Sequence, residues 1–519
     1  MQGGRAVKTG QGVRGSVYGG WRHRFWALLL LLLGIWSSDL AHATTPRQTT
    51  SPVPADPESP LTPGGRWSVL VQDVRGGAPM LSQNATASQL PASTAKLLTT
   101  AYVLHTLGAQ DHLLTRVLAQ GLIAGRVVGP LIFLGGGDPN LSSRIFPFNG
   151  RTQRGPALSP LRDLAEQLWQ AGVREVPDGI LADTRLFPTE YAPTGWTPED
   201  QHYWYGAPIS ALSFNDAMVE VLVRPGARSG QRASADITPN PLGFIRNAVM
   251  TVGAGEGVIP LRLEIVGEHW VLTGSIRAHA APVGAMLAQP DPPRFAGLAL
   301  QQALLDQGIR VAGEVRVRAR GQGSAAPQRP FYPGHVVLAQ RQSSAIIDAV
   351  TVVNKVSENT HAEILLRDAD LARGGNGDTH SSLVRLQDWL LRERIIDRQA
   401  EVADACGLSR NARLSAADLV RALAQSYQQP WGALWRATLP VGAEDGTMRH
   451  RLQDLPLGTV RAKTGTLKDV LALAGLIRGD HGQEYAFAIL VNHFRSSPGA
   501  IRNRMDDLVR RIALGESAL

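Results

Sequence analysis

At 519 residues the chain is too long for a single ordinary hydrophobic core, so we expect two or three domains. Its composition, 44% hydrophobic and 18% charged residues, is that of a soluble globular protein. The net charge of +8 is scattered and lacks basic runs with interleaved aromatic residues, so no nucleic-acid partner is expected. Cys406 is the only cysteine, which excludes an intramolecular disulfide and makes a buried small side chain its expected role.

The N-terminal 65 residues carry the pattern of a targeting segment and a tether. Basic residues precede an apolar run over residues 25–36, and Ala41-His42-Ala43 follows it, as in a secretory signal peptide. We therefore expect a signal peptide over residues 1–43, a flexible Thr-, Pro- and Ser-rich linker over residues 44–65, and a periplasmic protein. Removal of the leader takes away five positive charges and one negative charge, so the net charge falls from +8 to +4. An uncleaved leader would act as an anchor and give a weak membrane association.

Residues 66–114 are expected to form the first part of one domain. Trp67–Val71 and Met80–Leu81 flank Gly76-Gly77, which indicates a β-hairpin. Leucine and alanine residues at helical spacing then predict a helix from about Ser93 to Leu107.

Residues 115–335 have a different residue pattern, which predicts one or two inserted β-rich domains. Short β-like runs recur at Leu131–Leu134, Gly179–Ala182, Val219–Val223, Leu261–Ile265 and Val315–Arg318. Helical patterns interrupt them at Leu161–Ala171 and Phe295–Gln307.

Residues 336–519 are expected to complete the first domain. Helical patterns lie at Ala345–Val356, His361–Leu371, Ser381–Leu391 and Ala416–Ala424. Two apolar runs, Val470–Ile477 and Tyr485–Val491, predict adjacent antiparallel strands, and a last helix is expected from about Ala500 to Leu514.

Lysine is rare in this chain, so each lysine is a candidate for a chemical role. Only five of the 52 basic residues are lysines, and arginine cannot replace an amine that must lose its proton. Lys96 closes S-x-x-K at residues 93–96, Lys463 opens K-T-G at residues 463–465, and Lys355 stands two residues before S-x-N at residues 357–359. S-x-N and K-T-G triplets also occur elsewhere in the chain, so each motif alone is weak. The three motifs in this order, in a chain with so few lysines, are a specific signal.

The motifs suit nucleophilic catalysis by a serine. Ser93 and Lys96 are three residues apart at a helix start, so both side chains lie on one face. A lysine activates a serine hydroxyl when burial and nearby positive charge lower its pKa from about 10.4. Ser357 is placed to relay a proton between Lys96 or Lys463 and a leaving amine, and Asn359 to hold a substrate amide.

The K-T-G segment suits the binding of an extended peptide. On an edge strand it would pair with the substrate backbone by β-augmentation, and Gly465 would allow a close approach. Lys463 supplies a cation for a substrate carboxylate, and Thr464 and Thr466 supply hydroxyl groups.

Together, the three motifs resemble those of the penicillin-binding protein and serine β-lactamase superfamily. The sequence around the motifs resembles one branch of that superfamily, the type 4, class C penicillin-binding proteins. These are D-alanyl-D-alanine carboxypeptidase/endopeptidases. The matching segments span nearly the whole chain after the leader: residues 91–97, 207–213, 357–363, 407–410, 439–441 and 463–467. In the family's Asp-Gly-Ser-Gly-Leu-Ser-Arg stretch, Cys406 and Ala405 stand here for Ser and Gly.

The resemblance implies an α/β (α+β) fold. Its transpeptidase/β-lactamase-like domain has an antiparallel sheet flanked by helices and is interrupted by a large β-rich insertion. It implies that Ser93 is acylated by the penultimate D-Ala carbonyl, with Lys96 as base. The backbone N–H groups of Ser93 and Thr466 would form the oxyanion hole. Ser357, Asn359 and Lys463 would complete the proton network. Four further residues are expected around the stem-peptide pocket: Asp200, Tyr205, Arg410 and Lys468.

The expected function is therefore a serine D,D-carboxypeptidase/D,D-endopeptidase that acts on D-Ala-D-Ala termini or D-Ala cross-links. Its partners would be peptidoglycan stem peptides, with β-lactams as covalent inhibitors. No cofactor is expected, and no metal, because the histidines lack metal-ligand spacing. Two alternatives stay open: a serine β-lactamase, for which no deacylating base is identifiable, and a non-catalytic wall-binding protein that retains the groove.

Overall fold

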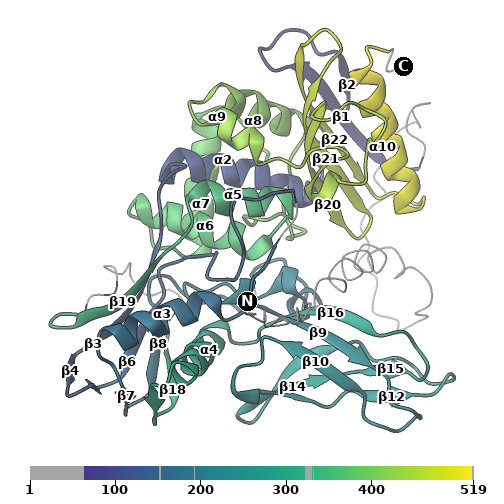
Figure 1. Cartoon of the computed structure of the whole chain (residues 1–519). Coiled ribbons are helices and arrows are strands. Elements are labelled where there is room, and N and C mark those ends of the chain that lie inside the picture. Colours follow the sequence, from purple (N-terminus) through teal and green to yellow (C-terminus); the bar gives the residue numbers. More distant parts are fainter. Residues whose placement is uncertain (1–63, 151–152, 192, 322–329, 331, 517–519) are drawn as a thin grey trace, which may run out of the picture.

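The computed structural model of the chain describes residues 64–150, 153–191, 193–321, 330 and 332–516 (Figure 1). The expected signal peptide, and the expected linker up to residue 63, lie outside the described residues. Among the residues that are described, no helix is both long and apolar enough to cross a membrane.

A five-stranded antiparallel sheet forms the centre of one half of the molecule. Its order is β2 (Leu81–Gln83), β1 (Arg66–Asp73), β22 (Glu484–Asn492), β21 (Val470–Arg478) and β20 (Val460–Leu467). The expected hairpin pairs β1 with β2, and Gly76 and Gly77 in its connection have φ of 98° and 104°, which glycine adopts without strain. The two strands expected near the C-terminus pair as β21 and β22. The strand that carries the K-T-G motif, β20, lies at the edge.

Helices cover both faces of this sheet (Figure 1). On one face lie α2 (Lys96–Leu107), α5 (Ile346–Lys355), α6 (Asn359–Ala372), α7 (Thr379–Arg392), α8 (Ala416–Gln428) and α9 (Gly432–Ala437). On the other lies α10 (Pro498–Ala513). Successive side chains of a strand point to opposite faces, so in β21 Ala472 and Ala474 pack on the helical layer while Leu471 and Leu473 pack against α10. Because both faces are covered, β21 is apolar along almost its whole length.

The inserted region begins and ends with two strands that pair with each other. Strand β3 (Leu114–Ala119) lies beside β19 (Val336–Gln342) in a second five-stranded sheet. The rest of that sheet is β6 (Leu131–Leu134), β8 (Ile180–Asp183) and β18 (Val315–Arg318), in the order β18-β8-β6-β3-β19. The expected limits of the insertion, residues 115 and 335, stay a prediction; the pairing joins β19, which follows residue 335, to β3.

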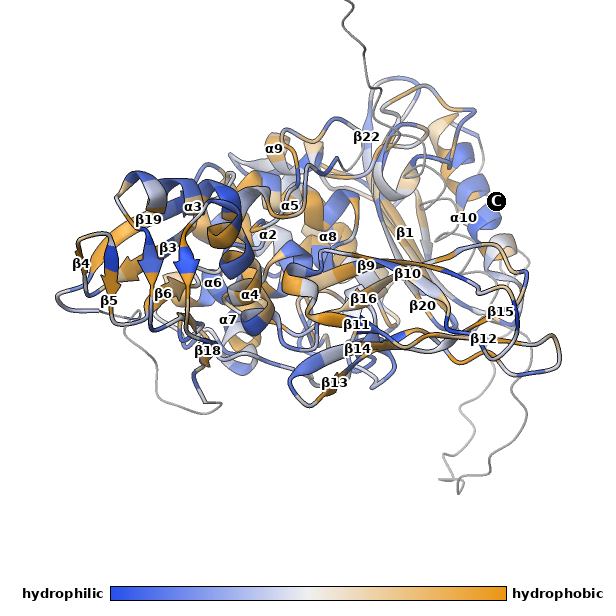
Figure 2. Ribbon diagram, turned by 60° about the horizontal axis from the view of Figure 1, so that its bottom comes forward, coloured by the Kyte–Doolittle hydropathy of each residue, from blue (hydrophilic) through white to orange (hydrophobic). Residues whose placement is uncertain are grey.

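The other sheets of the insertion are small. They are β17 (Arg310–Val311), β7 (Glu175–Val176), β5 (Arg126–Val128) and β4 (Gly121–Ile123); β10 (Ser234–Thr238), β9 (Met218–Arg224) and β16 (Val283–Ala288); β11 (Ile245–Asn247), β14 (His269–Thr273) and β13 (Arg262–Val266); and β12 (Met250–Val252) with β15 (Ser275–Arg277). Their inner faces share one hydrophobic core with helices α3 (Ser159–Gln170) and α4 (Pro292–Asp306). Helix α3 buries Leu161, Leu164 and Leu168, three and four residues apart, and carries hydrophobic and hydrophilic residues around its circumference (Figure 2).

Candidate active site

Ser93 lies in a short 3-10 turn, η1 (Ala92–Ala95), which leads directly into α2. The sequence predicts a helix from about Ser93; the α-helical part begins three residues later because the first turn is tighter. Asn492 of β22 holds the preceding segment, since its side chain accepts from the N–H of Leu90 (2.8 Å) and donates to its carbonyl (3.2 Å). Ala92 then turns sharply with φ of 47°. These contacts place the Ser93 hydroxyl beside the sheet, half-buried and accessible.

Lys96 is fully buried beneath this serine. Its Nζ donates to Ser93 Oγ (2.9 Å), to Asn359 Oδ1 (2.6 Å) and to the carbonyl oxygen of Cys406 (2.6 Å). An ammonium group has three donors and here has three acceptors. Burial lowers the pKa of Lys96 below its ordinary value, while the carboxylates of Asp404 and its neighbours oppose that shift. The geometry is that of a serine hydroxyl in direct contact with a desolvated amine.

Lys463 is the second fully buried lysine, and it faces the same space from β20. Its Nζ donates to Ser357 Oγ (2.8 Å) and to the carbonyl of Thr464 (2.9 Å). Burial, and then the positive charge of Lys96, holds the pKa of Lys463 well below its ordinary value. Two lysines that repel each other in a desolvated site favour a state with one neutral amine.

The S-x-N segment connects the two lysines. Ser357 has φ of 65°, in the left-handed region, and this turns the chain into the first residue of α6, Asn359. Asn359 accepts from Lys96 through Oδ1 and donates through Nδ2 to the carbonyl of Tyr205 (2.7 Å). Both ends of its amide are therefore in use, and its orientation is determined by the donors and acceptors around it.

The rest of the K-T-G segment approaches η1 closely. A Cβ on Gly465 would lie 3.0 Å from Ala92 Cβ and from the carbonyl oxygen of Pro91, so a side chain at this position would press on the turn that carries Ser93. Thr464 Oγ1 lies 2.9 Å from the exposed hydroxyl of Thr447, and Thr466 is exposed.

The four residues expected around the stem-peptide pocket lie in two groups. Asp200 accepts from the N–H (3.0 Å) and hydroxyl (2.6 Å) of Thr197, and Tyr205 stacks on Tyr203 with ring centroids 5.7 Å apart. Arg410 donates to the carbonyl of exposed Lys468 (2.9 Å), next to the turn between β20 and β21.

One backbone contact connects the segment before Asp200 with the other group. The N–H of Arg410 donates to the carbonyl of Gly195 (3.5 Å), five residues before Asp200. The assignment of the four residues to a substrate pocket stays a prediction.

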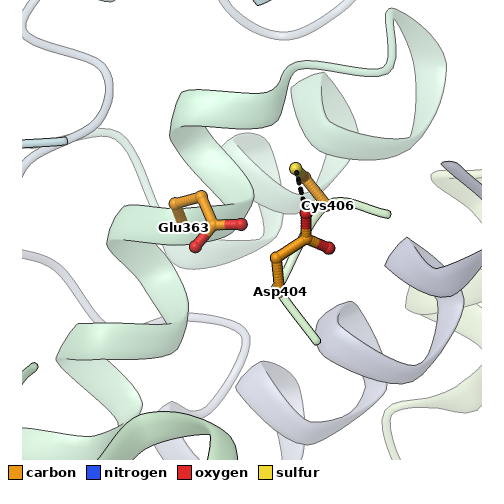
Figure 3. Close-up of side chains that lie close together, drawn as sticks. All are labelled: Glu363, Asp404 and Cys406. Atoms are coloured by element: carbon orange, nitrogen blue, oxygen red, sulfur yellow. Dashed lines mark hydrogen bonds between the residues drawn. The ribbon is translucent and has the colours of Figure 1, made fainter. Parts of the chain in front are cut away.

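Behind Lys96 the structure brings together three potential metal ligands, Glu363, Asp404 and Cys406, with ligand atoms within 4.8 Å of one another (Figure 3). Each already has hydrogen-bond partners: Glu363 accepts from the N–H of Ala405 (2.8 Å), Asp404 from the indole of Trp196 (2.9 Å), and Cys406 Sγ lies 3.5 Å from Asp404. Burial raises the pKa of the Glu363 carboxyl to about 7 and that of the Cys406 thiol well above its usual range. We interpret the group as a buried hydrogen-bonded support for the segment beneath Lys96.

Two functional contacts were not predicted from the sequence. The carbonyl of Cys406 and the carbonyl of Tyr205 accept from Lys96 and Asn359. Every residue has a backbone carbonyl, so residue type contains no signal for such acceptors. Thr447, beside Thr464, was also missed; its only signal is its place in the turn Asp445-Gly446-Thr447.

Known proteins resemble this chain over most of its length. The model of the D-Ala-D-Ala carboxypeptidase 3 (S13) family matches residues 55–513. A D-alanyl-D-alanine carboxypeptidase of Actinomadura sp. (strain R39) is 32% identical over 491 residues, covering 91% of this chain and 86% of that protein. D-alanyl-D-alanine carboxypeptidase DacB of Haemophilus influenzae is 22% identical and covers 87% of this chain and 90% of its own.

A solved structure confirms the expected fold class. The crystal structure of penicillin binding protein 4 (dacB) from H. influenzae superimposes with a TM-score of 0.75 at 21% identity, over 87% of this chain and 97% of that one. The family resemblance inferred from the motifs and the expected enzyme class are confirmed as well. The chain therefore belongs to the D-Ala-D-Ala carboxypeptidase 3 (S13) family and is a serine-type D-Ala-D-Ala carboxypeptidase.

Proposed function

We propose that the protein cleaves D-Ala-D-Ala termini, and D-Ala cross-links, of peptidoglycan stem peptides through an acyl-Ser93 intermediate, and that β-lactams trap it at this stage. The observation that carries the proposal is the 2.9 Å contact between Ser93 Oγ and the Nζ of fully buried Lys96. A serine hydroxyl needs a base to become a nucleophile, and a desolvated amine of lowered pKa is such a base.

The reaction follows from these positions. Neutral Lys96 takes the hydroxyl proton while Ser93 Oγ bonds to the carbonyl carbon of the penultimate D-Ala. The backbone N–H groups of Ser93 and Thr466 would stabilise the oxyanion. The C–N bond then breaks, and Ser357, in contact with Lys463, passes a proton to the leaving amine. The terminal D-Ala departs, and water hydrolyses the acyl ester to free the serine.

Substrate would bind along the edge strand β20. Residues 440–442 already pair with this edge at Val460–Ala462, so the K-T-G stretch beyond Ala462 is the part that suits pairing with an extended peptide. The hydroxyls of Thr464 and Thr466 suit a terminal carboxylate. The stem-peptide side chain would lie among the residues of the two pocket groups. Their charges suit a side chain with both an amine and a carboxylate, because Asp200 in one group is acidic and Arg410 and Lys468 in the other are basic.

The expected location supports the same substrate. The basic and apolar pattern of residues 1–43, with its small-residue cleavage site, suits export to the periplasm, where peptidoglycan lies. If the leader is not removed, it would hold the protein weakly at the membrane.

The test is intact-mass spectrometry over time after addition of benzylpenicillin, with Ser93→Ala alongside. We expect a long-lived adduct on the wild type and none on the variant. Ser82→Ala is a matched control: Ser82 also opens an S-x-N triplet, but it is exposed on β2, at the opposite edge of the sheet from β20. It should acylate like the wild type.

The other outcomes separate the alternatives. Rapid loss of the drug without an adduct indicates a β-lactamase, and intact drug indicates a non-catalytic wall-binding protein. Digestion of a stem pentapeptide beside a D-Ala cross-linked dimer then compares carboxypeptidase with endopeptidase activity.

A further inference from the structure

A buried cluster of charged side chains lies behind the S-x-N segment. Arg144 Nη2 lies 2.6 Å from Asp216 Oδ2 and 3.5 Å from Glu358 Oε2. Arg154 also forms an ion pair with Asp216, and His361 Nε2 lies 2.9 Å from Asp216 Oδ1. All five side chains are less than 10% exposed, and that of Asp216 is completely buried. A buried charge is costly unless it is closely paired, so these five side chains stay buried only in an arrangement that pairs them.

The cluster joins the two halves of the molecule. Arg144 and Asp216 come from the chain between β6 and the start of β9, in the inserted region. Glu358 and His361 come from the start of α6: Glu358 directly precedes Asn359, and His361 follows it by two residues. Glu358 is also the residue between Ser357 and Asn359, so an ion pair to Glu358 acts directly on the motif.

The backbone that presents Asp216 is held in an unfavourable conformation. Asn215, Asp216 and Ala217 have φ of 56°, 57° and 53°, a run of three residues in the left-handed region. Left-handed backbone at residues other than glycine persists only where the surroundings determine it. Here the side chain of Asn215 donates to the carbonyl of Met218 (2.9 Å), and the N–H of Gln289 donates to the carbonyl of Ala217 (2.8 Å). This backbone conformation directs the Asp216 carboxylate at Arg144 and His361.

The charge state of the cluster supports a holding role. Burial opposes ionisation of Asp216, but Arg144 and Arg154 hold its pKa well below the ordinary value. Burial, and then the charge of Asp216, raises the pKa of Glu358. The ionised carboxylate of Asp216 therefore anchors Arg144, and Arg144 reaches on to the weaker acid next to Ser357.

We propose that Asp216 and Arg144 are positioning residues by which the inserted region holds the Ser357–Asn359 segment in register with the two lysines. Loss of the anchor would move Ser357 Oγ away from Lys463 and Asn359 Oδ1 away from Lys96, contacts now at 2.8 Å and 2.6 Å. This inference rests on the proposed acylation of Ser93, and it gives the insertion a part in the reaction.

The test compares two neutralised carboxylates of the inserted region, Asp216→Asn and Asp183→Asn. Asp183 is the matched control because it is also completely buried and paired with an arginine, Arg185, at 2.7 Å, but contacts no motif residue. The acylation rate constant k2 and the pre-acylation binding constant are measured separately with a fluorescent penicillin, at a temperature where melting curves show each variant folded. A displacement of about 1 Å reduces a reaction by roughly 100-fold. We expect k2 of Asp216→Asn to fall between about 10- and 100-fold with the binding constant little changed, and Asp183→Asn to keep k2.

A second pair covers the case in which Asp216→Asn does not fold. Arg144→Lys keeps a charge near Asp216 and should retain more of k2 than Arg144→Met at equal melting temperature. The proposal is overturned if folded Asp216→Asn acylates at the wild-type rate, if Asp183→Asn loses k2 equally, or if the two Arg144 variants do not differ. If wild-type Ser93 is not acylated at all, the proposed function fails instead, so the two failures are distinguishable.

Discussion

Replacing Lys96 by methionine separates the role of this lysine in the reaction from its role in the fold. Methionine has a similar length and no charge, so it fills the same buried space. If neutral Lys96 is the base for Ser93, its loss removes a general-base contribution of about 100- to 10,000-fold, equivalent to roughly 3–5 kcal/mol in the activation free energy. We therefore expect acylation by benzylpenicillin to slow by that factor.

Stability should change much less. Asn359 Oδ1 and the carbonyl of Cys406, at 2.6 Å from Nζ, lose their donor, and each buried acceptor left unpaired costs about 1–3 kcal/mol. Against this, the variant no longer removes from water an amine that is charged in the unfolded chain, and that transfer costs several kcal/mol whether the folded protein keeps the charge or releases the proton. Because the two contributions are similar in size and opposite in sign, the melting temperature should stay within a few degrees of the wild type.

Two measurements check this expectation: the time course of the acyl adduct by intact mass, and thermal melting by circular dichroism. A Lys96→Met protein that is folded and acylates within about threefold of the wild type would refute the assignment of Lys96 as the base, since the general-base contribution alone exceeds that factor. A collapse of the melting temperature would instead show that the two unpaired acceptors cost more than burying the amine does.

Two further predictions concern other buried charges. Lys355→Met leaves the buried carboxylate of Asp445, now 2.5 Å from Lys355 Nζ, without its cation, so stability should fall by about 3–5 kcal/mol, seen as a lower melting temperature. Unlike Lys96, Lys355 contacts a carboxylate directly, and an unchanged melting temperature would contradict this reasoning. Burial raises the pKa of Glu363 from 4.5 to about 7, so the native state binds its proton more tightly and loses that stabilisation as pH rises through 7. Glu363→Gln does not titrate, so its stability relative to the wild type should rise by about 3 kcal/mol between pH 4.5 and 7; a difference independent of pH would show that Glu363 is not protonated in the native state.

Much of the architecture could be predicted because it depends on short-range patterns. The alternation and apolar runs of β21 and β22, and the helical spacing in α2, α5 and α8, are visible over ten or so residues. The start of α2 was predicted less well, because a 3-10 turn and an α-helical turn have the same apolar spacing at this length.

The sequence by itself determined the chemistry that neighbours along the chain can express. Ser93 and Lys96 are three residues apart, so their contact follows from helical geometry alone, and the scarcity of lysine marked Lys463 as part of the same site. The tertiary structure decided the hydrogen-bond partners, the burial and the pKa of those groups. Asn359 and the carbonyl of Cys406 reach Lys96 from 263 and 310 residues away along the chain. Asp216 comes to the S-x-N segment from the inserted region. Burial and electrostatic fields arise from packing between distant segments, so the pKa of each lysine is a property of the folded protein and not of its motif.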